Sequence, residues 1–378
     1  MTASATKFST YKTHMFLTII IAFVSLIGLI IAHELGHFMF AKKFGVKVEE
    51  FGVGYPPRLF GKKIGETVYS LNLLPFGAFV KIYGEEGEKS SVSLSEPEEE
   101  KRSFQNKPIY QRMLIILGGV ISFWIISIVL LSFVMALGAP TAISDTDNGN
   151  LKDVKVQIAA VSLDSPADKS GIKPGDAIIS VNELKIDKVV EIQEFTQSHK
   201  GEEILLTIER GKEIFNVSLV PRVNPPEGEG AIGVSLVRTA MKSYPWWQAI
   251  WQGISATFNL TIGVVQGWEK AITNAIEGTP SGVQVMGPIG IFSLFNQSSQ
   301  LGVNYFLQFI ALISVYLALF NILPIPALDG GKLLFLTIEA VRKKPVSLRL
   351  EQKITAVFFT LLIMMMVWAT IKDITRLF

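Results

Sequence analysis

The sequence has no cysteine and little charge. Only 18% of its 378 residues are charged, whereas 49% are hydrophobic, and the mean hydropathy is +0.39. The missing cysteines exclude disulfides, thiolate metal ligands and a cysteine nucleophile, so any metal site must use His, Asp and Glu side chains. The formal net charge of +2 provides no basic excess for binding nucleic acid. A composition this apolar predicts a membrane protein rather than a soluble enzyme.

Four stretches lack charged side chains for long enough to cross a bilayer, which takes about 20 helical residues. The uncharged runs are 15–32, 113–139, 305–328 and 354–371. The first run has no small-residue cleavage site after a short core, so we expect it to be retained rather than removed as a signal peptide. With their flanks, the predicted transmembrane helices comprise residues 1–43, 112–140, 303–331 and 352–373. The predicted fold class is therefore a polytopic α-helical membrane protein.

The polar segment 44–111 separates the first two predicted spans. Within it, "YSLNLLPFGAFVKIYGEE" places Val, Phe, Tyr and Leu residues around Pro75 and Gly77. This pattern predicts a β-hairpin that is apolar enough to approach the membrane. The "EGEKSSVSLSEPEEEKRS" that follows is rich in Ser, Glu and Lys and has almost nothing to bury, so it is predicted to be a flexible linker.

Residues 150–238 differ in composition from the rest of the chain, because charges return and short strands alternate. The candidate strands are "VKVQIAAV", "DAIISVN", "EEILLTIER" and "EIFNVSLV". Turn signals such as "SGIKPGD" and "ERGKE" separate them. This block predicts a small soluble α+β domain inserted between the second and third spans.

Segment 243–300 begins with an uncharged stretch that is long enough to be a further span. Apolar residues recur in it at steps of three and four, at Trp247, Trp251, Ile254, Phe258, Ile262 and Val265. Polar or small residues recur one position later, from Gln248 to Gln266. The double stripe predicts an amphipathic helix that lies at the membrane interface instead of crossing the bilayer.

Basic residues concentrate in the loops after the first and third spans. The first of these loops contains Lys42, Lys43, Lys47, Arg58, Lys62 and Lys63. The second contains Lys332, Arg342, Lys343, Lys344, Arg349 and Lys353. Because basic loops stay on the cytoplasmic side, both loops are predicted to be cytoplasmic. Both termini and the inserted domain then lie on the other side of the membrane.

The first span contains ionisable residues in the motif "HELGH". His33 and His37 are four residues apart, so both imidazoles lie on one helix face and can reach one cation, with Glu34 beside them as a base. A zinc ion there lowers the pKa of its water toward ~7 and polarises a scissile carbonyl. The alternative is a set of buried polar side chains satisfied by their neighbours. Inside a membrane that alternative weakens, because each ionisable group costs about 2.5 to 3.5 kcal/mol.

A further ligand is available in "NILPIPALDGG", where Asp329 is the only acid between Tyr305 and Lys332. An Asp before two glycines is often only a turn residue. Here Pro324 and Pro326 break the helix and leave the carboxylate at membrane depth, where irregular backbone lines a cavity or is buried in protein. If the three ligands share one metal, the first and third spans run in the same direction. A further span within segment 243–300 would make the first and third spans run in opposite directions. The shared metal therefore favours an interfacial helix in that segment.

The motifs "HELGH", "LLPFGAFVKIYGE", "MGPIGIF" and "NILPIPALDGG" resemble, in this order, those of the site-2 protease family of intramembrane zinc metalloproteases. The resemblance covers nearly the whole chain. It implies that His33, His37 and Asp329 bind Zn²⁺ and that Glu34 is the general base and acid. The inserted block, with "SPADKSGIKPGDAIISVNEL", looks like one copy of a circularly permuted bacterial PDZ domain, which some members carry in tandem.

The resemblance also implies substrate contacts. Asn321 is expected to help hold the substrate backbone. Phe76, Gly77, Phe79 and Lys81 are expected to contact an extended substrate segment that pairs with the hairpin. Strand addition suits a helical substrate, because a helix hides its own carbonyls from attack.

One position departs from the family pattern. Many relatives begin the second span with a Gly-Pro and an Asn three residues after the Gly, whereas this chain reads "LGGVISFW", with Gly119 and Ser122. The zinc ligands are unaffected, but the polar or oxyanion contact of that Asn is not expected here.

The resemblance places the chain in a bacterial inner membrane, with anti-sigma-factor-like proteins or signal-peptide remnants as substrates. The PDZ-like domain either captures peptides or excludes substrates with large outer domains, since fold alone does not decide function. Two other classes stay open from the residues alone. A catalytically silent adaptor would have no need of Glu34. A transporter would also place ionisable groups in the membrane, but the internal repeats typical of transporters are missing.

Overall fold

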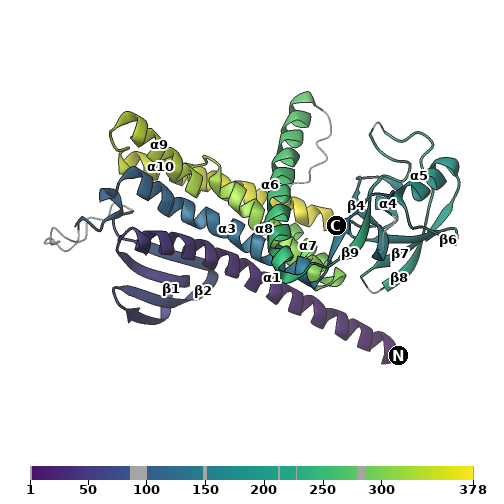
Figure 1. Ribbon diagram of the computed structural model, residues 1–378, viewed down its shortest axis with the longest axis horizontal. Helices are drawn as coiled ribbons and strands as arrows, with labels where there is room; N and C mark the ends of the chain where they lie inside the picture. Colours follow the sequence, from purple (N-terminus) through teal and green to yellow (C-terminus); the bar gives the residue numbers. More distant parts are fainter. Residues whose placement is uncertain are drawn as a thin grey trace.

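The computed structural model describes residues 2–85, 100–147, 151–211, 213–226, 228–278 and 286–377, so most of the predicted linker lies outside the described residues. Figure 1 shows a bundle of long helices with a small sheet along one side and a second, larger sheet in a separate domain at one end. The helices of the bundle are α1 (Thr2–Lys43), α3 (Ile109–Leu137), α6 (Trp246–Glu277), α7 (Pro288–Leu301), α8 (Val303–Ile322), α9 (Asp329–Arg342) and α10 (Leu348–Leu377).

Four described helices are long and apolar enough to cross a membrane. They are Ile19–Lys43, Ile109–Leu137, Val303–Ile322 and Leu348–Thr375. These helices correspond to the four predicted spans. The third differs at its end, because Pro324 and Pro326 cannot continue an α-helix. α8 therefore stops at Ile322, and Asp329 begins α9 after a short irregular loop.

α3 is the central helix of the bundle and contacts α1, α6 and α8. α1 and α3 approach so closely that a Cβ on Gly36 would lie 2.2 Å from the carbonyl oxygen of Gly118. Apolar side chains fill the rest of this region, among them Leu29, Phe123 and Phe295. In a membrane, apolar side chains gain little by moving from lipid to a helix interface, because both surroundings are apolar. Close packing of small residues is therefore a principal source of helix association there.

β1 (Val48–Ile64) and β2 (Thr67–Ile82) form the small sheet beside α1. The two strands are antiparallel and join at a turn that contains Gly65, whose φ is +62°. Both strands bend, so the sheet has segments in the spatial order 58–64, 67–72, 48–53 and 78–82.

The position of the hairpin turn differs from the prediction. The segments on either side of Pro75 and Gly77 do not pair with each other, because each pairs with an opposite edge of segment 48–53. Alternation of apolar residues indicates strands but does not say which strands are neighbours. The result is a broader sheet than a single hairpin would form. Segment 78–82, which directly follows Gly77 in the chain, is one of its two edges.

The inserted domain contains strands in the order β3–β9–β4–β5–β7–β8, with β6 beside β5. The strands are β3 (Ala139–Ala142), β4 (Lys152–Val161), β5 (Ala177–Val181), β6 (Leu184–Lys185), β7 (Ile204–Arg210), β8 (Glu213–Leu219) and β9 (Val234–Lys242), and the helices are α4 (Pro166–Lys169) and α5 (Val189–Ser198). The predicted strands correspond to β4, β5, β7 and β8. The domain is wider than the predicted 150–238, because Ala139 pairs with Lys242 and extends the sheet at both ends.

The inserted domain rests on the junction between α7 and α8. The side-chain amide of Gln157 donates a hydrogen bond of 3.2 Å to the hydroxyl of Tyr305. At a turn of the domain, a Cβ on Gly211 would lie 2.5 Å from the carbonyl oxygen of Gln300. The described domain and the bundle are therefore in direct backbone contact.

α6 stands across the other long helices in Figure 1. One stripe of the helix is buried against α3, where a Cβ on Gly253 would lie 2.1 Å from the hydroxyl oxygen of Ser132. Its aromatic stripe faces outward, and the exposed fractions of Trp247 and Trp251 are 56% and 73%. α6 is not among the described helices that are apolar enough to cross a membrane.

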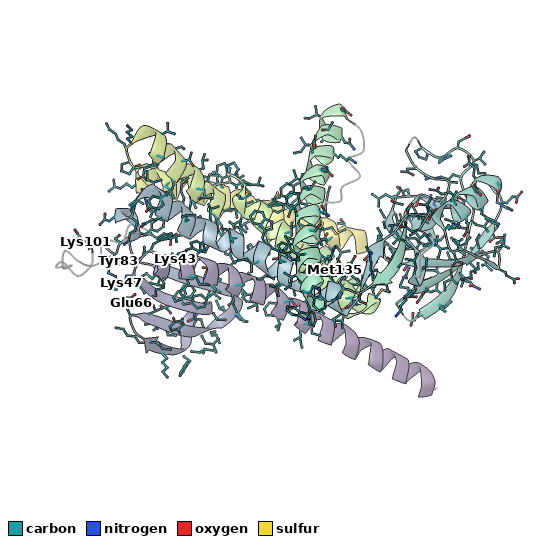
Figure 2. The ribbon with its side chains drawn as sticks, viewed as in Figure 1. Lys43, Lys47, Glu66, Tyr83, Lys101 and Met135 are labelled. Carbon is teal, nitrogen blue, oxygen red and sulfur yellow. The ribbon has the colours of Figure 1, made fainter. Side chains whose placement is uncertain are left out.

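Charged side chains gather at the end of the bundle that is away from the inserted domain. Figure 2 labels Lys43, Lys47 and Glu66 there, whereas Met135 lies toward the domain. Glu66 accepts hydrogen bonds from Lys42 at 2.6 Å and from Arg102 at 2.8 Å. The bond from Lys42, followed by that from Arg102, holds the pKa of Glu66 below its usual range.

Candidate metal centre

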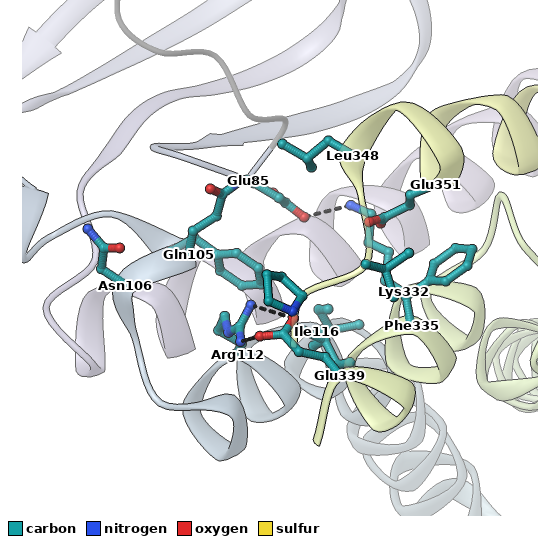
Figure 3. Close-up of a pocket in the computed structure, with 14 residues that line it drawn as sticks. Glu85, Gln105, Asn106, Arg112, Ile116, Lys332, Phe335, Glu339, Leu348 and Glu351 are labelled. Carbon is teal, nitrogen blue, oxygen red and sulfur yellow. Dashed lines mark hydrogen bonds and ion pairs between the residues drawn. The ribbon is translucent and has the colours of Figure 1, made fainter. Parts of the chain in front are cut away.

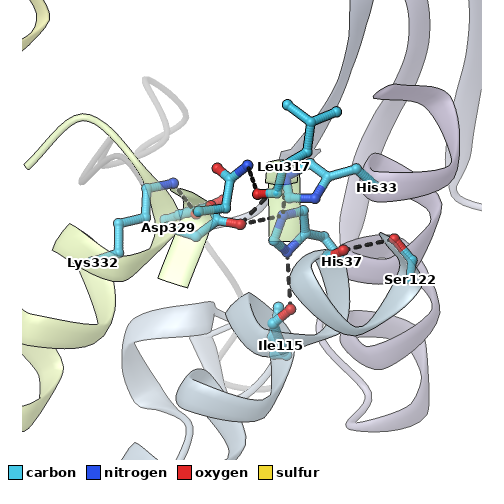
Figure 4. A network of polar contacts seen from close by, with 10 residues as sticks. His33, His37, Ile115, Ser122, Leu317, Asp329 and Lys332 are labelled. Carbon is cyan, nitrogen blue, oxygen red and sulfur yellow. Dashed lines mark hydrogen bonds and ion pairs between the residues drawn. The ribbon is translucent and has the colours of Figure 1, made fainter. Parts of the chain in front are cut away.

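His33 and His37 lie on one face of α1, as their spacing predicts. Their Nε2 atoms are 3.2 Å apart. The Nδ1 atom of His37 is 2.9 Å from the carbonyl oxygen of Ile115 on α3 (Figure 4). A carbonyl can only accept, so His37 carries its proton on Nδ1, and its Nε2 lone pair points toward His33. Metal-binding histidines are commonly held in this way by a second hydrogen bond.

Asp329 is the first residue of α9 and reaches both imidazoles. Its Oδ2 atom is 3.3 Å from the Nε2 of His33 and 3.3 Å from that of His37. The loop before α9 folds tightly over the start of the helix. A Cβ on Gly330 would lie 1.9 Å from the carbonyl oxygen of Leu323, so the glycine after Asp329 is required for this turn.

The three side chains fit a tetrahedral zinc ion. If ligand atoms lie about 2.0 to 2.1 Å from zinc, neighbouring ligands of a tetrahedron are about 3.3 to 3.4 Å apart. The three separations here are 3.2, 3.3 and 3.3 Å. The Oδ2 atom of Asp329 is also buried without a hydrogen-bond partner among the described residues. In the described part of the chain, His33, His37 and Asp329 are the group of side chains that can hold a metal ion.

Glu34 follows His33 on α1, and its side chain is partly buried next to this group. Its carboxylate makes no hydrogen bond or ion pair within the described residues, so it is free to exchange a proton with a bound molecule. The adjacent position in sequence keeps this carboxylate close to the ligands without making it one of them.

Gly119 of α3 packs directly on the two imidazoles. A Cβ at this position would lie 2.3 Å from the Nε2 of His37 and 2.7 Å from the Cε1 of His33. Ser122, one turn further along, donates its hydroxyl to the carbonyl oxygen of Gly119 at 2.6 Å (Figure 4). Where the chain departs from the family pattern, Gly119 therefore leaves space for the imidazoles, and Ser122 forms its hydrogen bond within α3.

Four of the predicted substrate residues lie on β2, which contacts α1, and the fifth lies on α8. Phe76 is 66% exposed, and its ring lies 6.1 Å from that of Phe23 on α1. Gly77 has a φ of +135° at the bend of β2. In segment 78–82, the Phe79 ring stacks on Tyr55 at 6.2 Å.

The other two predicted substrate residues have partners within the protein. The Nζ atom of Lys81 is 3.3 Å from the carboxylate of Glu49. Asn321 lies at the end of α8, and its amide donates 2.9 Å to the carbonyl oxygen of Leu317 in the preceding turn. Both side chains lie on the elements that flank the site, but neither contacts the three ligands in the described structure.

Sequence reasoning did not identify the groups that hold the site in place. The Ile115 carbonyl is a backbone atom, which no side-chain pattern reveals. Lys332, one turn after Asp329, donates 2.6 Å to Glu85 at the end of the small sheet. The charge of Glu85 is the main cause that raises the pKa of Lys332 above its usual range. Two adjacent glycines within an apolar span, in "LGGV", were the available signal for the packing at Gly119.

Comparison with known proteins decides the family. The profile of Peptidase family M50 matches residues 21–365. The chain belongs to peptidase family M50. It is 33% identical over 357 residues to a candidate zinc metalloprotease of Clostridium perfringens, with 94% of this chain and 98% of that protein covered. It is 28% identical over 438 aligned residues to the regulator of sigma-W protease RasP of Bacillus subtilis, with 96% and 100% covered.

A solved PDZ domain of the SdrC-like protein from Listeria monocytogenes is also similar to part of the chain. It is 20% identical, covers 22% of this chain and 86% of that domain, and has a TM-score of 0.20. Membership of family M50 makes the chain a zinc metalloprotease. The adaptor and transporter classes that the sequence left open are therefore set aside.

Proposed function

We propose that the protein hydrolyses peptide bonds in or near transmembrane segments of other membrane proteins. The observation that carries this proposal is the location of the metal centre. His33 and His37 lie within a helix long and apolar enough to cross a membrane, and Asp329 meets them from the start of α9. A metalloprotease site at that depth is suited to substrates that are themselves in the membrane.

In this proposal His33, His37 and Asp329 hold Zn²⁺. When bound, the ion supplies a water that ionises near neutral pH and polarises the scissile carbonyl. Glu34 accepts a proton from the attacking water and passes it to the leaving amine nitrogen, so one water is consumed and a carboxylate and an amine are released. The contact between His37 and the Ile115 carbonyl keeps the ligand in one tautomer, and Asp329 supplies the single negative charge among the ligands.

The same proposal gives the substrate an extended conformation. Segment 78–82 pairs with segment 48–53 on one side, and no described strand pairs with its other edge. An added substrate strand would expose its carbonyls, which a helix keeps in its own hydrogen bonds. Phe76, Gly77, Phe79 and Lys81 would line that strand, and Asn321 would hold the substrate backbone from α8.

The end of the bundle with Lys43 and Lys47 is proposed to face the cytoplasm, because basic loops remain on that side. The inserted domain then lies on the other side of a bacterial inner membrane, and α6 lies at that interface with its aromatic stripe in lipid. The name of the Bacillus subtilis relative, a regulator of sigma-W, supports anti-sigma-factor-like substrates. Signal-peptide remnants are the other substrate class. The PDZ-like domain either binds peptides or limits the size of outer domains.

The test is the variant Glu34→Gln, assayed on a reporter that consists of a transmembrane segment between two detectable domains. We expect cleavage to fall by at least about a hundredfold, because removal of a general base costs typically 10² to 10⁴. Zinc content of the purified variant should stay near one per chain. The matched control is His33→Ala, which should lose zinc as well as cleavage. Cleavage that persists in Glu34→Gln would overturn the proposal.

A further inference from the structure

A cavity lies between the end of β2, the start of α3, α9 and the start of α10. Figure 3 shows it from close by. Its volume is about 440 Å³, and Glu85, Arg112, Lys332, Glu339 and Glu351 are the charged side chains that line it. A neighbouring hollow of about 480 Å³ shares Glu85, Lys332 and Glu351. Together they form one charged cleft at the end of the bundle that is away from the inserted domain.

Two ion pairs account for most of the charge in this cleft. The Nζ atom of Lys332 is 2.6 Å from a carboxylate oxygen of Glu85. Arg112 forms a two-pronged pair with Glu339, in which Nη1 donates 3.2 Å to Oε2 and Nη2 donates to the other oxygen. Each positive charge in the cleft therefore already has a carboxylate partner.

Glu351 is the remaining carboxylate. It lies in the first turn of α10, is partly buried and lines both parts of the cleft. No hydrogen bond or ion pair engages its side-chain carboxylate among the described residues. The two cations and three carboxylates among the described residues that line the cleft thus leave one uncompensated negative charge, and a cationic group is the complementary ligand.

The cleft adjoins the proposed cleavage site. Ala327 and Leu328, which line it, directly precede Asp329 in the chain. Lys332 lies one helical turn after Asp329 and projects into it. A substrate held at Asp329 therefore has one flank within reach of Glu351.

We propose that this cleft binds a lysine or arginine side chain on the flank of the substrate, with Glu351 as its anionic partner. This inference rests on the proposed function and adds a determinant of substrate choice. Membrane proteins concentrate Lys and Arg at the cytoplasmic ends of their transmembrane helices, which is the side proposed for the cleft. A partly buried carboxylate attracts such a charge more strongly than an exposed one would.

A charge exchange tests the proposal in the full-length protein. The enzyme forms are wild type, Glu351→Gln and Glu351→Lys, and the reporters carry either Lys or Glu at each position of the flank next to the scissile bond. We expect Glu351→Lys to cleave the Lys reporter about tenfold more slowly than wild type and to cleave the Glu reporter faster than wild type does. Glu351→Gln should show a smaller loss on the Lys reporter and little preference between the two.

The control variant is Glu194→Lys, which makes the same charge change on exposed α5 of the inserted domain. It should discriminate between the reporters as wild type does. Zinc content verifies that each variant is folded. If folded Glu351→Lys or Glu351→Gln keeps the wild-type ratio of cleavage rates on the two reporters, the cleft does not select substrates by charge. Failure of the wild type to cleave either reporter would instead contradict the proposed function itself.

Discussion

Gly119 shows how closely a single residue can limit the geometry of the metal centre. Two imidazoles and a carboxylate must stay about 3.3 Å apart to fit one zinc ion. Helix α3 leaves them that space because position 119 has no side chain, and a Cβ there would lie 2.3 Å from a ligand nitrogen. Movement of α1 away from α3 would make room, but it would separate the close packing of Gly36 on Gly118.

We therefore predict that Gly119→Ala displaces His37 and lowers cleavage by about a hundredfold, as misplacement by about 1 Å does in other enzymes. Zinc content should fall in parallel, whereas loss of the base in Glu34→Gln should leave zinc bound. Gly28→Ala is the matched control, because Gly28 lies on α1 with nothing within 4 Å of its Cβ position. An active, zinc-replete Gly119→Ala variant would show that the ligands have more room than the structure gives them.

The three side chains that meet at the candidate metal centre could be predicted from the sequence, whereas the groups that support them could not. The spacing of His33 and His37 is a local property of one helix, and Asp329 stands out as an isolated acid in an apolar run. The Ile115 carbonyl and Gly119 act only through contact between helices. Such contacts depend on how α1 and α3 cross, which no local pattern specifies.

At the scale of elements, the small sheet illustrates the same limit. Its strands could be predicted from alternating apolar residues, but their order could not. Segment 48–53 lies between two parts of β2, and a hairpin centred on Pro75 would have left it out. The predicted amphipathic pattern of α6, in contrast, needed only one helix, and the described helix runs through that stretch from Trp246 to Glu277.

The motif "MGPIGIF" acquires a structural role at this scale. Asp373 of α10 is 6% exposed and accepts a hydrogen bond of 2.8 Å from the backbone N–H of Gly290, in the first turn of α7. A Cβ on Gly287 would lie 2.8 Å from the same carboxylate. These glycines thus let the start of α7 approach α10, where the carboxylate satisfies an N–H that has no partner within its own helix.

Asp373→Ala should remove this cap and destabilise the protein by about 1 kcal/mol. In a chain of this size we expect the thermal midpoint in detergent to fall by about 2 °C. Asp373→Asn keeps an acceptor oxygen, so its thermal midpoint should fall by less. Equal midpoints for Asp373→Ala and wild type would mean that this contact does not secure α7.

At the scale of the whole molecule, the inserted domain is attached through two neighbouring strands. Ala139 pairs with Lys242, and the N–H of Tyr244 donates 3.0 Å to the carbonyl oxygen of Met135. The chain therefore leaves the bundle and returns to it at nearly the same place. Insertions with adjacent ends are commonly tolerated, because their removal leaves the host structure continuous.

Replacement of residues 139–242 by a short Gly-Ser linker should leave zinc content unchanged and keep cleavage of a reporter that has no outer domain within about threefold of wild type. A second reporter with a folded outer domain separates the two roles of the insertion. Faster cleavage of that reporter indicates a size filter. Cleavage of both reporters that is slower by more than threefold would contradict this expectation and indicate peptide capture. Loss of zinc in the shortened protein would show that the domain supports the catalytic helices.

The overall organisation of four apolar helices with one inserted α+β domain could be predicted, because length, hydropathy and strand patterning are properties of separate stretches. The contact of the domain with the α7–α8 junction could not. It depends on Gly211 meeting the backbone near Gln300, two positions far apart in the sequence and without any distinctive pattern.

The contact between Gly36 and Gly118 also bears on how a substrate arrives. A membrane protein that diffuses laterally in the bilayer must pass between helices to reach His33 and His37. The backbones of α1 and α3 touch at these glycines, so that seam leaves no room for another chain. α10 is mostly exposed and packs chiefly on α7. We expect substrates to approach from the exposed side of α10, because two residues without side chains close the seam between α1 and α3.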